Sequence, residues 1–128
     1  MAPATVLIID SDADSIEIYS LLLRHHGYEV IHARDAATGL RLAFESNPDL
    51  VVSELFLPPV PGGEVVDQLR SDNRTAATPL IVLDSIPNFG HDVSRRLRGL
   101  SRLTKPCEPS RLLQEIERLL EQRATMAH

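Results

Sequence analysis

Four charged side chains follow the apolar segments of this chain, each at the point where a segment ends. Asp10, Glu54 and Asp84 carry carboxylates, and Lys105 carries an amine, although the four are far apart along the chain. Clustered carboxylates can bind a hard cation or exchange protons, and an ammonium group beside them can neutralise them instead. The chemistry therefore depends on whether the fold brings these groups together.

The apolar segments have the length and composition of buried strands. They cover residues 6–9, 28–31, 50–52 and 80–83, with a weaker segment at 100–103. Near-continuous apolarity indicates burial on both faces, as in a parallel sheet. Apolar residues at helical spacing lie between these segments and after the last one, which predicts a strand–helix unit repeated five times. We expect the fourth helix to be short or displaced, because proline, asparagine and glycine interrupt residues 87–90.

Residues that start and stop helices agree with this division. Asp35 can cap the second helix, Gly27 can end the first, and Pro109 suits the first position of the last helix. In an open sheet of this kind the ligand crevice lies beyond the carboxyl ends of the strands. We therefore expect the four charged side chains to meet in one pocket.

Length and composition fit a single globular domain. The chain has 128 residues, of which 43% are hydrophobic, so we expect one domain over residues 1–122 and a disordered tail over residues 123–128. The net charge of −5 argues against nucleic acid as a partner. One cysteine, no secretion signal and no apolar stretch of membrane-spanning length predict a cytoplasmic protein without membrane contact.

Three motifs resemble the receiver domains of two-component signalling. IDSD at residues 9–12 is similar to the family's acidic opening, PDLVVSELFLP at 48–58 to the stretch around its phosphoacceptor, and TKP at 104–106 to its late lysine. The resemblance extends over residues 6–120, and Gly62 falls where the family keeps a glycine. It implies an α/β, flavodoxin-like (βα)5 fold with a doubly wound parallel sheet in the strand order 2-1-3-4-5.

The resemblance also assigns roles to positions that are altered here. In the family, paired acids hold magnesium, an aspartate accepts phosphate, a hydroxyl and a lysine bind the phosphoryl group, and an aromatic ring reports the switch. The second acid is Ser11 in this chain, the phosphoacceptor position is Glu54, the hydroxyl position is Asp84, and the aromatic position is Arg102. Only Lys105 is retained among the phosphoryl-binding positions.

These changes predict a receiver that does not switch by phosphorylation. Ser11 is a weaker ligand than a carboxylate for a hard cation, Glu54 is one methylene too long for in-line attack, and Asp84 repels an incoming phosphoryl group. We expect no cofactor and a charge-assisted contact from Lys105 to Glu54, Asp84 or both. The peptide bond before Pro106 is commonly cis in the family, and we expect it to be cis here.

Three other functions stay open on the sequence. The first is a conventional phosphorelay receiver that uses Mg²⁺ and tolerates the altered pocket. The second is a divalent-cation module, with ligands drawn from Asp10, Asp12, Glu54 and Asp84 or from the backbone of Phe56. The third is a small acid–base enzyme, against which the chain offers no glycine-rich phosphate loop and no nucleophile motif.

A basic cluster marks a candidate partner surface. Arg95, Arg96, Arg98 and Arg102 fall where the family's fourth helix and fifth strand bind partners. Arginine forks recognise acidic surfaces, although a solvated helix face would have the same composition. We expect protein partners such as a histidine kinase or a downstream regulator. A homodimer through the fourth helix, fifth strand and fifth helix is also consistent with the family.

Overall fold

A single parallel sheet forms the centre of the molecule. The computed structural model describes residues 3–55, 57, 64–84 and 100–126. The strands pair in the order β2-β1-β3-β4-β5, all in parallel, which confirms the fold and the strand order that the resemblance implied. Their bounds are β1 (Thr5–Ile9), β2 (Glu29–Ala33), β3 (Leu50–Glu54), β4 (Leu80–Asp84) and β5 (Ser101–Thr104).

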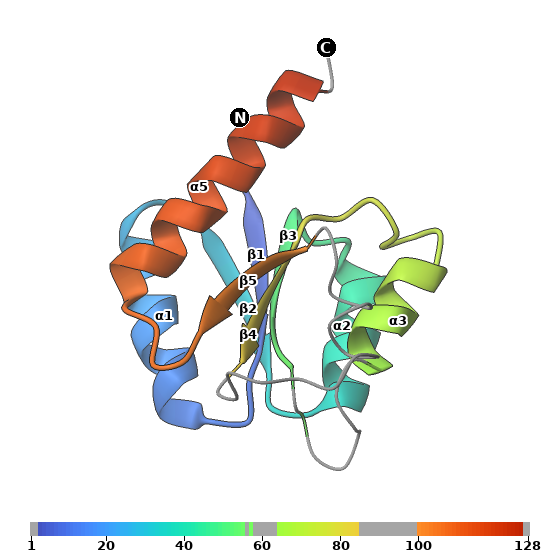
Figure 1. Cartoon of the computed structure of the whole chain (residues 1–128), viewed down its shortest axis with the longest axis horizontal. Helices are drawn as coiled ribbons and strands as arrows, with labels where there is room; N and C mark the ends of the chain where they lie inside the picture. The colour runs from blue at the N-terminus through green and yellow to red at the C-terminus, as the bar shows by residue number, and fades with distance from the viewer. Residues whose placement is uncertain (1–2, 56, 58–63, 85–99, 127–128) are drawn as a thin grey trace.

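Helices cover both faces of the sheet. In Figure 1, α1 and α5 lie against one face, and α2 and α3 lie against the other. Alternate strand residues therefore enter two separate cores, with Val6 and Ile8 on the α1–α5 side and Leu7 and Ile9 on the α2–α3 side. The predicted fourth helix lies outside the described residues. The described helices are α1 (Ala13–His25), α2 (Ala36–Ser46), α3 (Glu64–Ser71) and α5 (Pro109–Met126).

The predicted helix signals are confirmed. The Asp35 side chain caps α2 by accepting a hydrogen bond from the Thr38 N–H at 2.8 Å. Gly27 follows the end of α1 with φ of +91°, a conformation that glycine adopts without strain. Pro109 is the first residue of α5.

Helix α5 continues beyond the end that the sequence predicted. Residues 123–126 belong to the helix, so the prediction of a disordered tail from residue 123 is wrong for these four. Arg123 Nη1 donates a hydrogen bond to the Asp49 carbonyl oxygen at 2.9 Å, and an Asp49 carboxylate oxygen accepts from the Thr5 N–H at 2.7 Å. This contact joins the helix to the loop before β3.

No helix in the described part of the chain is long and apolar enough to cross a membrane.

A buried carboxylate fastens α5 to β5. Glu115 is only 8% exposed, and it accepts hydrogen bonds from the Ser101 hydroxyl and from Arg118 Nε and Nη2, the latter two at 2.6 and 2.8 Å. The Arg118 guanidinium is the main cause that lowers the pKa of Glu115 to about 2, and the Ser101 hydroxyl adds to it. We refer to Glu115, Ser101 and Arg118 as the α5 lock.

Candidate functional site

The carboxyl edge of the sheet brings the four predicted charged residues together. Backbone hydrogen bonds continue past the strand ends: the Asp10 N–H donates to the Ala33 carbonyl at 3.0 Å, and the Lys105 N–H donates to the Asp84 carbonyl at 2.6 Å. Glu54 is the last residue of β3, between the two. The prediction of one site is confirmed for Asp10, Glu54 and Lys105, because the lysine pairs with both acids. Asp84 lies at the same edge of the sheet, where its carboxylate faces Arg102. These four residues and Arg102 form what we call the charged cluster.

The lysine lies closest to Asp10, a partner that the sequence did not suggest, and forms a longer ion pair with Glu54, which it did. Lys105 Nζ lies 2.7 Å from Asp10 Oδ2 and 3.8 Å from Glu54 Oε1, whereas the described residues show no ion pair between this ammonium group and the Asp84 carboxylate. Asp10 is completely buried, and its other oxygen accepts from the Asp12 N–H at 2.9 Å. Burial raises the pKa of Asp10, and the ammonium group opposes that rise. Asp10, the most deeply buried acid of the charged cluster, therefore pairs with the only lysine of the chain.

Ser11 supplies hydrogen bonds to Glu54, in addition to the longer ion pair with Lys105. Glu54 Oε2 accepts hydrogen bonds from the Ser11 N–H at 2.8 Å and from the Ser11 hydroxyl at 2.9 Å. The Ser11 carbonyl in turn accepts from Arg34 Nη2 at 3.0 Å and Nε at 3.3 Å. Sequence reasoning missed Arg34. It directly follows β2 at the same edge of the sheet, so the rule that selected the other strand ends also applies to it.

Asp84 is the least satisfied acid of the charged cluster. It is 2% exposed, and neither of its carboxylate oxygens has a hydrogen-bond partner among the described residues. Arg102 Nε lies 3.9 Å from Asp84 Oδ2, at the outer limit of an ion pair. The position where the family keeps an aromatic ring therefore supplies a cation to the cluster. Three carboxylates face two cationic side chains, which leaves a formal charge of −1.

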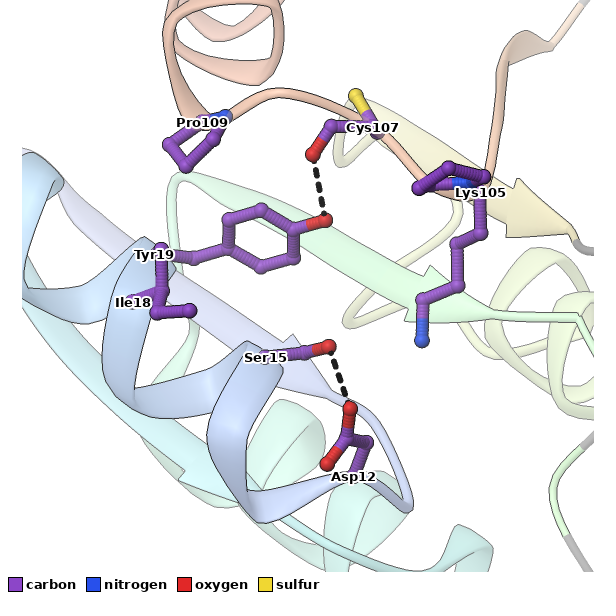
Figure 2. Close-up of a pocket in the computed structure, with 8 residues that line it drawn as sticks. Asp12, Ser15, Ile18, Tyr19, Lys105, Cys107 and Pro109 are labelled. Atoms are coloured by element: carbon purple, nitrogen blue, oxygen red, sulfur yellow. Dashed lines mark hydrogen bonds between the residues drawn. The ribbon is translucent and has the colours of Figure 1, made fainter.

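Asp12 serves as a helix cap beside the charged cluster. Its carboxylate accepts from the Asp14 N–H at 3.1 Å and from the Ser15 hydroxyl at 2.9 Å, and these bonds lower the pKa of Asp12. Figure 2 shows the contact with Ser15. This use differs from the role of cation ligand that the sequence left open for Asp12, because the first turn of α1 presents backbone N–H groups that a side chain at this position satisfies.

A groove opens between α1 and the segment that joins β5 to α5 (Figure 2). The Tyr19 hydroxyl crosses it and donates to the Cys107 carbonyl at 3.1 Å, a contact that the sequence did not indicate. Burial raises the pKa of Tyr19 to about 12, so the hydroxyl keeps its proton. The predicted cis peptide bond between Lys105 and Pro106 is confirmed. The groove has a volume of about 430 Å³ and is lined by residues that include Asp12, Ser15, Ile18, Tyr19, Lys105 and Cys107.

Among the described residues, the two acids nearest Lys105 already have internal partners. One oxygen of Asp10 faces Lys105 Nζ and the other accepts from a backbone N–H, while Glu54 Oε2 accepts two hydrogen bonds from Ser11. Within the described residues, no three carboxylate, imidazole or thiol side chains are placed to share a metal ion. Hard cations require several oxygen ligands whose lone pairs are available.

Part of the predicted site lies outside the described residues. This applies to Arg95, Arg96 and Arg98 of the basic cluster, to the backbone of Phe56, and to the loop at residues 58–63. Arg102 is the member of the basic cluster that the structure describes.

Comparison with known proteins identifies the family. Residues 6–117 match the response regulator receiver domain. The chain belongs to this family. Receiver domains act in two-component signalling through protein partners, and the homologues of this chain are signalling proteins rather than classical enzymes.

Relatives in the receiver family cover nearly the whole chain. PilH of Pseudomonas aeruginosa is 29% identical over 91% of this chain and 98% of PilH, and the response regulator DivK of Brucella anthropi is 29% identical over 92% and 97%. RpaA of Synechocystis is 34% identical over 90% of this chain but 48% of its own, so this chain spans about half of RpaA. The structure of the chemotaxis response regulator CheY4 of Vibrio cholerae matches with a TM-score of 0.81, at 27% identity over 91% of this chain and 98% of that chain.

Proposed function

We propose that this receiver domain signals by protein–protein contact without being phosphorylated, and that the charged cluster holds it in one conformation. The observation that carries the proposal is the pairing of Lys105 with Asp10 at 2.7 Å, together with the two hydrogen bonds from Ser11 to Glu54. Both groups that the family uses around its phosphoryl group have internal partners here. An incoming phosphoryl group has to displace these partners before it can bind.

The geometry around Glu54 supports this proposal. One carboxylate oxygen accepts two hydrogen bonds from Ser11, and the other faces the Lys105 ammonium at 3.8 Å. An attacking carboxylate needs a free oxygen lone pair aligned with the phosphorus atom. The hydrogen bonds that stabilise ionised Glu54 therefore also reduce its reactivity.

Electrostatic repulsion also disfavours phosphorylation of Glu54. A phosphoryl group on Glu54 would bring a charge near −2 to a cluster in which Asp84 is already buried and lacks a hydrogen bond from the described residues. Two like charges about 4 Å apart repel by about 4 kcal/mol at the effective dielectric constant of a protein surface. Lys105 offsets part of this only by leaving Asp10. We infer that the domain takes up neither phosphate nor Mg²⁺.

The partner in this proposal is a protein, either a histidine kinase or a downstream regulator. Assembly of two copies through β5 and α5 is consistent with the same proposal, and the α5 lock would keep that surface rigid. A fixed conformation lowers the entropy that a binding surface loses on association. The domain would then act as an adaptor with a fixed conformation. Its concentration in the cell, rather than its phosphorylation, would control the signal.

Intact-mass measurement with acetyl phosphate and Mg²⁺ tests the proposal. We expect the native chain to keep its mass. A matched variant that restores the family pattern, with Ser11→Asp, Glu54→Asp and Asp84→Ser together, should gain one phosphoryl group. Glu54→Asp alone separates the effect of acceptor length from the effect of its neighbours. Stoichiometric phosphorylation of the native chain would overturn the proposal and favour a conventional phosphorelay receiver.

A further inference from the structure

A second groove lies between α1 and β2, the outermost strand on its side of the sheet. We call it the α1–β2 groove. It has a volume of about 390 Å³, and its lining includes Glu17, Ser20, Leu21, Arg24, His32 and Arg34. None of the proposed functions of the charged cluster uses this surface, apart from Arg34.

The α1–β2 groove is basic in a chain whose net charge is −5. Arg24 donates one hydrogen bond to the Val30 carbonyl at 3.3 Å, and Arg34 donates two to the Ser11 carbonyl. A guanidinium has five N–H donors, so both keep donors for a ligand, and neither forms an ion pair with a carboxylate of the described residues. His32 is exposed beside them.

The positions of these basic residues set a spacing for the ligand. Arg24 is in the last turn of α1, whereas Arg34 follows β2 at the carboxyl edge of the sheet, near the start of α1. Glu17 lies on α1 between the two ends of the groove, roughly two helical turns before Arg24. An inorganic anion is too small to reach both ends, and Glu17 repels it from the middle.

Beside Glu17, the groove also presents an exposed leucine and a hydroxyl group without a partner among the described residues. Leu21 is 63% exposed, which makes it one of two large hydrophobic side chains that the described surface presents in this way. Ser20 is 3% exposed, and its hydroxyl has no hydrogen-bond partner within the described part of the chain. A ligand in the groove could therefore make an apolar contact with Leu21 as well as polar contacts with the arginines.

We propose that the α1–β2 groove binds an acidic amphipathic segment of a protein partner. One carboxylate of the segment would bind Arg24, a second would bind Arg34 and His32, and an apolar side chain between them would cover Leu21. This inference rests on the proposed function, since it names a docking surface for a signal carried by protein contact. Charge complementarity and the distance between the basic ends select this partner over a small anion.

Arg34 links the α1–β2 groove to the charged cluster. Its guanidinium holds the Ser11 carbonyl, and the Ser11 N–H and hydroxyl hold Glu54. A carboxylate that binds the remaining N–H donors of Arg34 would pull on the same guanidinium that holds the Ser11 carbonyl. Binding in the groove therefore reaches Glu54 through two consecutive sets of hydrogen bonds.

Two-dimensional amide NMR on the full chain tests this inference. The probe is a synthetic leucine-rich helical peptide with glutamates roughly two turns apart on its apolar face. We expect it to shift the amide resonances of Leu21, Arg24, His32 and Arg34, and also that of Ser11. A matched peptide with lysine in place of glutamate, and inorganic phosphate, should leave these resonances unchanged.

Variants of the chain complete the test. Arg24→Glu combined with His32→Glu should weaken binding of the acidic peptide by about tenfold or more, since like charges then face each other. Arg41→Glu is the matched control, because Arg41 is exposed on α2, away from the groove, and should leave the affinity unchanged.

Each result bears on a distinct claim. Shifts confined to residues other than the groove lining and Ser11, equal binding of the lysine peptide, or the same shifts with phosphate would overturn the docking inference. A response in the groove without one at Ser11 removes the link through Arg34. Phosphorylation of a native chain that still binds the peptide contradicts the proposed function alone.

Discussion

Two sites in this domain bury carboxylates at the sheet, and they treat them in opposite ways. In the α5 lock, Glu115 is 8% exposed and accepts hydrogen bonds from Ser101 and Arg118, which lower its pKa to about 2. In the charged cluster, Asp84 is 2% exposed without a hydrogen bond from the described residues, and burial raises the pKa of Asp10. The protein therefore stabilises the ionised form of Glu115, whereas burial of the acids at the carboxyl edge lowers the stability of the fold.

The difference follows from where each acid is attached. Glu115 extends from a helix, where an arginine one turn later reaches the same carboxylate. Asp10 and Asp84 are short side chains at the ends of central strands, whose backbones are fixed by the sheet. Acids held in this way depend on cations that reach the same edge of the sheet, which are Lys105 for Asp10 and Arg102 for Asp84.

Removing the lysine should have the largest effect on stability. We expect Lys105→Met to lower the free energy of unfolding by about 3 kcal/mol at neutral pH, because it leaves Asp10 buried without its cation. Urea denaturation measures this. Arg41→Met, which removes an exposed ion pair, is the control and should cost less than about 0.5 kcal/mol. Equal stability of Lys105→Met and the native chain would show that the ammonium group does not compensate Asp10.

The α5 lock should give the next largest effect, with a clear dependence on pH. Glu115→Gln should cost about 1–2 kcal/mol at pH 7. The pKa of Glu115 in the folded chain is about 2, below its ordinary value of 4.5, so its contribution is complete above that value and is lost as the pH falls toward 2. Denaturation curves of both proteins should therefore converge in acid. A cost that stays constant with pH contradicts an ionised lock.

The smallest effect is expected at Asp10 itself. Asp10→Asn keeps an oxygen that accepts from the Asp12 N–H, and Lys105 keeps Glu54 at 3.8 Å, so the change at pH 7 should be below about 1 kcal/mol. Burial raises the pKa of Asp10 above 3.8, so its contribution to stability is present below that pH and is lost as the pH rises through the raised pKa. The variant should therefore gain on the native chain between acid and neutral pH. A cost as large as that of Lys105→Met would remove the contrast with Glu115.

The sequence predicted the positions in this site better than it predicted their partners. Strand patterns and the rule for open sheets placed Asp10, Glu54, Asp84 and Lys105 at one edge, and the structure agrees. The pairing of Lys105 with Asp10 depends on depth of burial, which alternating strands and helices do not reveal.

The sequence also did not predict contacts between residues that are far apart along the chain. The bond from Arg34 to Ser11 joins two loops, and the bond from Tyr19 to Cys107 joins α1 to the segment before α5. Arg123 likewise extends α5 by a contact with Asp49, which lies 74 positions earlier. Composition near each residue carries no information about such distant partners.

The presence of a single lysine gives this domain an unusual chemical property. Any reagent or enzyme that modifies ε-amines can act on the chain only at the ion pair with Asp10. Acylation of that amine would remove its charge and leave the neighbouring acids without their principal counter-ion. The rate of acylation would thus record, at one atom, how often the site opens to solvent.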